Sequence, residues 1–150
     1  MTALAKTRLR ILLLENNNLL RSMLHRLLLN QGWEVIGYPD PEGCPLHHAT
    51  KCACGCTEVC ADVIITDWEM PHVDGFTFVH DLLEKGCKVG YLAMFTGRDD
   101  AACLAQARAL GFTVFSKSVG LTALLEWLHT VERLVNGGRL LTPWADLCRT

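Results

Sequence analysis

An α/β fold built on a doubly wound parallel sheet is the prediction for this chain of 150 residues. Short apolar runs typical of buried strands alternate with segments whose apolar residues recur at helical spacing. The clearest strand is the Val-Ile-Ile-Thr run at residues 63–66, which leads directly into Asp67. Strands that alternate with helices imply right-handed crossovers and a parallel sheet covered by helices on both faces.

The order of the elements follows from this periodicity and from the residues that interrupt it. Apolar runs bounded by polar residues, glycine or proline predict five strands, at residues 10–14, 34–38, 63–66, 88–96 and 113–117. Apolar residues at intervals of three and four predict four helices, at residues 18–31, 75–85, 99–110 and 121–135. A glycine follows each of the first three helices, where a left-handed residue commonly ends a helix.

Composition indicates one domain of ordinary size. Half of the residues are apolar, which is enough for a core without disulfides. We expect tails at residues 1–7 and 137–150 around a domain at residues 8–136, with the second tail either docked or loose. The net charge of −2 and the pI near 6.3 give no global reason to bind nucleic acid or a membrane. With neither a signal peptide nor a spanning segment evident, a cytoplasmic location is expected.

Polar residues with chemical potential follow four of the predicted strands. Glu15 and Asn16 come after the first strand, Asp67 comes after the third, and Thr96 and Lys117 end the fourth and fifth. Because the carboxyl ends of parallel strands lie at one edge of an open sheet, we expect these residues to gather there. Each residue alone also fits a structural role, as a cap, a turn residue or a solvated charge.

This pattern resembles the receiver domain of two-component response regulators, of the single-domain type seen in chemotaxis regulators. The resemblance rests on VIITDWEMPHVDG at residues 63–75, on AMFTG around Thr96 and on FSK at Lys117, and it covers about residues 8–135. It implies a flavodoxin-like (βα)5 fold with five parallel strands. It also implies that Asp67 accepts a phosphoryl group from a sensor histidine kinase, with Mg²⁺ and a lysine spreading the charge of that group.

The resemblance further implies roles for individual residues. Asp67 would be the nucleophile, Lys117 would pair with the phosphoryl oxygens, and the Thr96 hydroxyl would donate a hydrogen bond to the attached group. The implied ligands of Mg²⁺ are Glu15, Asn16, Asp67 and the backbone carbonyl of Glu69. The added charge would alter binding of a downstream protein by a monomer or weak dimer. Any enzymatic activity would be self-catalysed phosphotransfer and dephosphorylation.

Three departures from the family pattern bear on this activity. Asn16 stands where a second acid is usual, so binding of Mg²⁺ should be weaker and phosphorylation slow or absent. Ser118 follows Lys117 where proline is usual, and Val114 occupies the position of a common aromatic switch residue. Phe115 is adjacent but should face the opposite side of its strand. A working receiver and a phosphorylation-independent interaction module therefore both stay open.

A segment rich in cysteine and histidine, residues 41–60, occupies the place of the family's second helix, and its helical periodicity is poor. We therefore expect that helix to be shortened or replaced by a cysteine-rich loop. Its candidate ligands are Cys44, His47, His48, Cys52, Cys54, Cys56 and Cys60. They exceed the four soft ligands that Zn²⁺ or an iron–sulfur cluster needs, although the spacing is not that of common zinc folds.

Three interpretations of this segment are open: a metal site, a redox disulfide, or small buried residues. Either of the first two would make the chain a metal or redox sensor on a degenerate receiver scaffold. Outside the segment, Cys87, Cys103 and Cys148 look isolated, and Cys87 could approach the others only through the fold.

Overall fold

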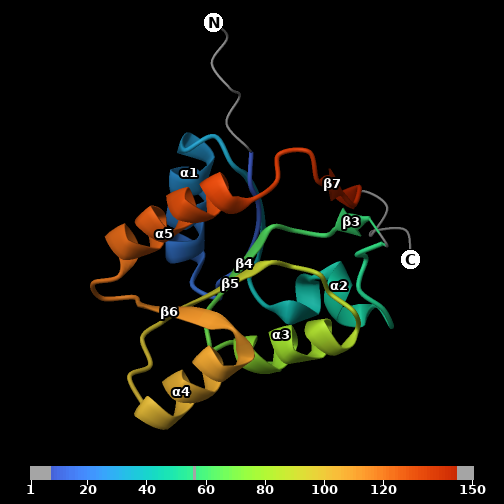
Figure 1. Ribbon diagram of the computed structural model, residues 1–150. Helices are drawn as coiled ribbons and strands as arrows, with labels where there is room; N and C mark the ends of the chain where they lie inside the picture. The colour runs from blue at the N-terminus through green and yellow to red at the C-terminus, as the bar shows by residue number, and fades with distance from the viewer. Residues whose placement is uncertain (1–7, 56, 145–150) are drawn as a thin grey trace, which may run out of the picture.

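Short aliphatic and β-branched runs form a five-stranded parallel sheet in the computed structural model, which describes residues 8–55 and 57–144 (Figure 1). The strands are β1 (Arg10–Leu14), β2 (Glu34–Tyr38), β4 (Val63–Thr66), β5 (Tyr91–Thr96) and β6 (Phe112–Ser116). Their spatial order is β2-β1-β4-β5-β6, and every neighbouring pair is parallel. The predicted α/β class is confirmed. β5 begins three residues later than predicted, since residues 88–90 form no ladder with a neighbouring strand.

The four predicted helices begin and end close to the predicted positions, and the described residues contain one further short helix, α2 (Pro45–His48). The other four are α1 (Asn18–Asn30), α3 (Gly75–Glu84), α4 (Ala101–Leu110) and α5 (Leu121–Leu134). Side chains cap three of them: Asn17 accepts from the Leu20 N–H, Asp74 from Thr77 and Asp100 from Cys103. Gly111 ends α4 at φ 117°, in the left-handed region that the sequence predicted.

The helices divide between the two faces of the sheet and enclose a core on each (Figure 1). α1 and α5 cover one face, and α2, α3 and α4 cover the other. Alternation along β6 sends Phe115 into the α1/α5 core, whereas Val114 packs against the opposite core. The predicted opposition of these two side chains is therefore confirmed.

The second helix of the fold is reduced to a single turn, as the sequence predicted. α2 spans four residues after a short 3-10 turn, η1 (Pro41–Gly43). Of the residues between α2 and β3 (Glu58–Val59), the described ones, 49–55 and 57, form no helix or strand. The described part of the C-terminal segment, residues 137–144, is docked rather than loose. Its strand β7 (Leu140–Leu141) pairs in parallel with β3, and the Trp144 indole donates to the Tyr38 hydroxyl at 3.2 Å.

Among the described residues, no helix combines the length and the apolar character that crossing a bilayer requires.

Candidate functional site

Asp67 lies at the carboxyl edge of the sheet, directly after β4. Its side chain is 6 % exposed, and Oδ1 accepts a hydrogen bond from the Trp68 backbone N–H at 2.7 Å. The start of α3 packs closely against it, because the Gly75 N–H donates to the Trp68 carbonyl at 3.0 Å. A Cβ at residue 75 would overlap the Asp67 carbonyl oxygen, so glycine is the residue that allows this approach.

Lys117 brings two carboxylates together. Its Nζ lies 2.6 Å from Asp67 Oδ2 and 2.9 Å from Glu15 Oε2, and both acids are almost fully buried. Burial of the ammonium favours its neutral form, but the hydrogen bonds and charges of Asp67 and Glu15 outweigh that effect and raise the pKa of Lys117. Two carboxylates thus share one ammonium, which leaves an excess of negative charge at this edge.

The loop after β6 directs Lys117 toward Asp67. The Lys117 N–H donates to the Thr96 carbonyl at 2.9 Å, and the Gly120 N–H donates to the Ser116 carbonyl at 2.7 Å. Ser118 contributes its N–H to Ser116 Oγ at 3.2 Å, and the two hydroxyls lie 2.8 Å apart. In this chain a serine pair therefore builds the turn where proline is usual.

Thr96 and an arginine form the rim of the same edge. Thr96 is buried, and its Oγ1 accepts from the Arg98 N–H at 3.1 Å. The Arg98 guanidinium lies 5.2 Å from the centre of the Trp68 ring and forms an ion pair with Glu69. The sequence did not single out Arg98, and its position two residues after Thr96 was the available signal.

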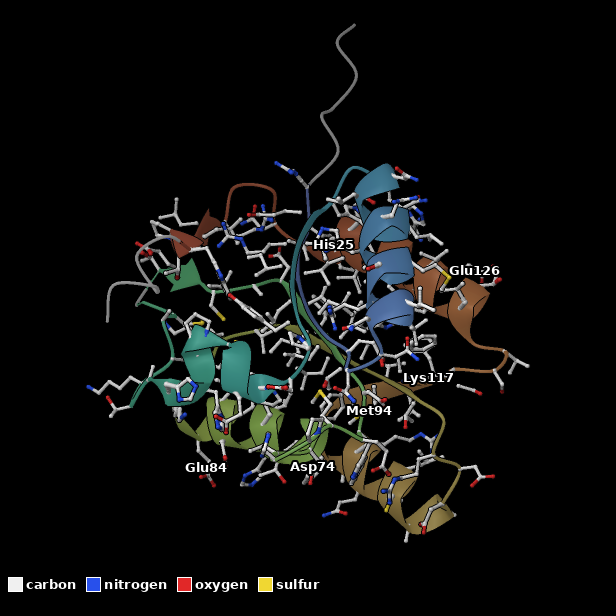
Figure 2. The ribbon with its side chains drawn as sticks, turned by 180° about the vertical axis from the view of Figure 1, so that it is seen from behind. His25, Asp74, Glu84, Met94, Lys117 and Glu126 are labelled. Atoms are coloured by element: carbon white, nitrogen blue, oxygen red, sulfur yellow. The ribbon has the colours of Figure 1, made fainter. Side chains whose placement is uncertain are left out.

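The predicted site residues thus divide into two groups. Lys117 contacts Asp67 and Glu15 directly, whereas Thr96 reaches the edge through its own strand. Asn16 is exposed next to Glu15, and the Glu69 side chain is committed to Arg98. In Figure 2, Lys117 lies toward the end of α3 marked by Asp74, and Glu84 marks the other end of that helix.

A group of four thiols lies at the opposite, amino edge of the sheet. The sulfur atoms of Cys52, Cys54, Cys60 and Cys87 lie within 4.8 Å of one another. Cys60 precedes β4, and Cys87 lies between α3 and β5, so the fold brings them together across 27 residues. Hydrogen bonds from the other three thiols, together with the Lys88 backbone N–H, hold the pKa of Cys54 below its ordinary value.

The structure brings together only part of the predicted soft-ligand set. Cys44 is fully buried outside the group, and burial raises its pKa to about 11. His47 lies 3.7 Å from a Glu42 carboxylate oxygen, and His48 contacts the Glu42 carbonyl at 2.7 Å, so neither histidine joins the thiols.

Two further predictions about the cysteines have different outcomes. Cys56 and Cys148 lie outside the described residues. Cys87 is not isolated, because the connection from α3 to β5 carries it to Cys60. The sequence signal for this contact is the position of Cys87 directly after Gly86, the glycine that ends a predicted helix. The described cysteines are free thiols.

Comparison with known proteins identifies the family. The model of the response regulator receiver domain matches residues 11–129, and the chain belongs to this family. No curated protein sequence matches the chain.

Solved structures share the fold. The chemotaxis protein CheY4 of Vibrio cholerae is 24 % identical, with a TM-score of 0.65 over 83 % of this chain and 98 % of its own. The N-terminal domain of an uncharacterized Wolinella succinogenes protein is 25 % identical, with a TM-score of 0.69 over 84 % and 95 %. The response regulator TrrA of Thermotoga maritima, solved with Mg²⁺ and BeF, is 19 % identical, with a TM-score of 0.62 over 81 % and 97 %.

Proposed function

We propose that this receiver accepts a phosphoryl group on Asp67 from a sensor histidine kinase and thereby changes its binding to a protein partner. The observation that carries the proposal is the contact of 2.6 Å between the Lys117 ammonium and the Asp67 carboxylate. Phosphoryl transfer requires a positioned nucleophile and positive charge over the equatorial oxygens of the group in transit. Asp67 and Lys117 supply both at the edge of the sheet where ligands collect.

The transfer step is a displacement at phosphorus. A carboxylate oxygen of Asp67 attacks the phosphorus of the kinase phosphohistidine, the P–N bond breaks, and its electron pair stays on the imidazole. The product is an aspartyl phosphate. The Trp68 N–H holds one carboxylate oxygen at 2.7 Å and so fixes the direction of the other. Lys117 then pairs with the phosphoryl oxygens.

The donor set at this edge fits Mg²⁺. Glu15 and Asp67 offer hard carboxylate oxygens, and the single ammonium of Lys117 leaves their charge unbalanced. The Asn16 amide and the Glu69 backbone carbonyl are the further ligands in this proposal. When bound, Mg²⁺ neutralises charge on the transferring group. Because Asn16 adds no charge, this site should hold the ion more weakly than a site with a second acid there.

The signal would reach the surface through Thr96 and Arg98. Phosphorylation adds a charge of about −1.5 to −2 beside Thr96, whose hydroxyl would then donate to a phosphoryl oxygen. That hydroxyl now accepts from the Arg98 N–H, so the loop before α4 is coupled to the acceptor. Val114 has no aromatic ring to move, which makes the Arg98 rim the route to the partner surface in this chain.

Incubation with acetyl phosphate and Mg²⁺, followed by intact mass measurement, tests the proposal. The wild type should gain the mass of one phosphoryl group, and Asp67→Asn should gain none. Lys117→Met should lower the labelling rate about 100-fold, as loss of one charge-stabilising donor does in other enzymes.

Asp74→Asn is the matched control, because Asp74 lies at the same edge and asparagine caps a helix equally well. It should label like the wild type. Absence of labelling in the wild type at any Mg²⁺ concentration, or equal labelling of Asp67→Asn, would refute the proposal.

A further inference from the structure

We propose that Cys52, Cys54, Cys60 and Cys87 bind one Zn²⁺ ion in a tetrahedral structural site, separate from the phosphoacceptor edge. Zinc lies about 2.3 Å from each thiolate sulfur, which places tetrahedral sulfurs about 3.8 Å apart. The Sγ atom of Cys52 lies 3.8 Å from the Sγ of Cys54 and 3.7 Å from the Sγ of Cys60. The Sγ atoms of Cys60 and Cys87 lie 3.7 Å apart. These three separations match the edge of a zinc tetrahedron, and all four sulfurs lie within 4.8 Å of one another.

Backbone amides complete the surroundings of the sulfurs. The N–H groups of Cys60 and Lys88 both donate to Cys54 Sγ at 3.2 Å. Such donors stabilise a thiolate and fix its orientation toward a metal. The Lys88 ammonium bonds the Gly55 carbonyl, which brings a positive charge next to a centre whose four thiolates outweigh the charge of the ion.

The spacing of the sulfurs favours one ion over the other chemistries open to cysteine. A disulfide joins two sulfurs at about 2.05 Å, whereas Cys52–Cys54, Cys52–Cys60 and Cys60–Cys87 are separated by 3.7 to 3.8 Å. An iron–sulfur cluster places several irons and sulfides between its thiolates, and sulfurs within 4.8 Å of one another enclose the room of one ion. Four protein ligands close the site, as in structural zinc centres.

The site would connect three segments that lie between the helices and strands of the main fold. Cys52 and Cys54 come from residues 49–57, Cys60 from the junction of β3 and β4, and Cys87 from the connection between α3 and β5. Thr142, next to β7, also bonds this region, with its N–H to the Val59 carbonyl at 2.9 Å and its hydroxyl to the Ala53 carbonyl at 3.0 Å. Metal ligation would thus replace the packing of a full second helix.

Metal analysis of protein purified without chelator tests the site. The wild type should contain one zinc per chain, and a double variant, Cys54→Ser with Cys87→Ser, should lose it. Cys103→Ser is the matched control, because Cys103 is half-buried and lies outside the group. Asp67→Asn should also keep its zinc, so failure of the phosphoacceptor proposal is distinguishable from failure of this one.

Cobalt replacement covers the case in which the double variant does not fold. Wild-type protein exchanged with Co²⁺ should show the intense sulfur-to-metal absorption of four thiolates and tetrahedral visible bands. Metal-free wild type with reduced thiols, stoichiometric iron, or disulfides between these cysteines would overturn the assignment. A cobalt spectrum with fewer than four thiolates would overturn it as well.

Discussion

The two edges of the parallel sheet differ in how their charged side chains are paired. At the amino edge the buried carboxylate of Asp62 is paired with Arg139 at 2.6 Å, and Arg10 is paired with Glu34 at 2.9 Å. At the carboxyl edge two buried acids share the single ammonium of Lys117. The pairs at the amino edge link separate segments, whereas the excess negative charge at the carboxyl edge attracts a cation, and a bound cation would offset the negative charge of a phosphoryl donor. The comparison supports the structural role proposed for the first edge and the chemical role proposed for the second.

Alanine at one glycine from each edge gives the largest expected contrast. Gly75→Ala places a methyl group into the Asp67 backbone, and it should cost more than about 3 kcal/mol in the free energy of unfolding. Gly90 directly precedes β5 at the amino edge, and its replacement by alanine meets open space, so Gly90→Ala should change the free energy of unfolding by less than about 1 kcal/mol. Urea unfolding measures both. Equal losses would show that α3 does not approach Asp67 as described.

Cys44, which is buried directly before α2, gives the stability of the protein a dependence on alkaline pH. Burial raises the pKa of this thiol from 9.0 to about 11, so above pH 9 the unfolded chain releases a proton that the native protein keeps. Stability should therefore fall between pH 9 and pH 11, by about 2 kcal/mol from this group.

The comparison of wild type with Cys44→Ala isolates that contribution. Under reducing conditions, urea unfolding at pH 8 and pH 11 should show a smaller loss in the variant. Identical losses in the two proteins would mean that this thiol titrates normally in the native state.

Asn16→Asp should sharpen the chemical character of the carboxyl edge. A second carboxylate beside Glu15 increases the charge that Mg²⁺ meets, and we expect roughly tenfold tighter binding. Fluorescence of Trp68, which follows Asp67 in the chain, provides a titration signal, and Asn17→Asp is the matched control because aspartate also caps α1. Unchanged Mg²⁺ affinity in Asn16→Asp would remove residue 16 from the ligand set.

The exposed pair of Glu69 and Arg98 should contribute least. Partly solvated ion pairs have coupling energies of about 0.2–1 kcal/mol, and salt screens them. A double-mutant cycle with Glu69→Gln and Arg98→Met, measured by urea unfolding, should give a coupling in that range. A larger coupling that persists in high salt would show that the rim is a rigid part of the site.

The sequence predicts the residues that meet at the carboxyl edge better than those that meet at the amino edge, for a physical reason. Asp67 and Lys117 directly follow strands, and the ends of parallel strands meet at one edge whatever the loops do. Cys87 joins Cys60 across 27 residues, through a connection whose path no periodicity specifies. The pairing of β7 with β3 was equally hidden, because strands of two residues leave no pattern to detect.

For the same reason, the sequence does not predict which side chains of the cysteine segment join the group of thiols. Cys44, His47 and His48 are close to the thiols in sequence, but the single turn of α2 directs Cys44 into the core and the histidines toward Glu42. Proximity along a chain predicts contact in space only where the backbone is regular. The described residues between α2 and β3 form no helix or strand, so the sequence does not predict which side chains meet there.

Identification of the residue that carries the phosphoryl group tests the central claim most directly. Borohydride reduces an aspartyl phosphate to homoserine, so protein treated with acetyl phosphate, reduced and sequenced by mass spectrometry reports the modified residue. The acceptor role of Asp67 predicts homoserine at position 67 and aspartate at position 74. Homoserine at another acid, or its absence from labelled protein, would contradict it.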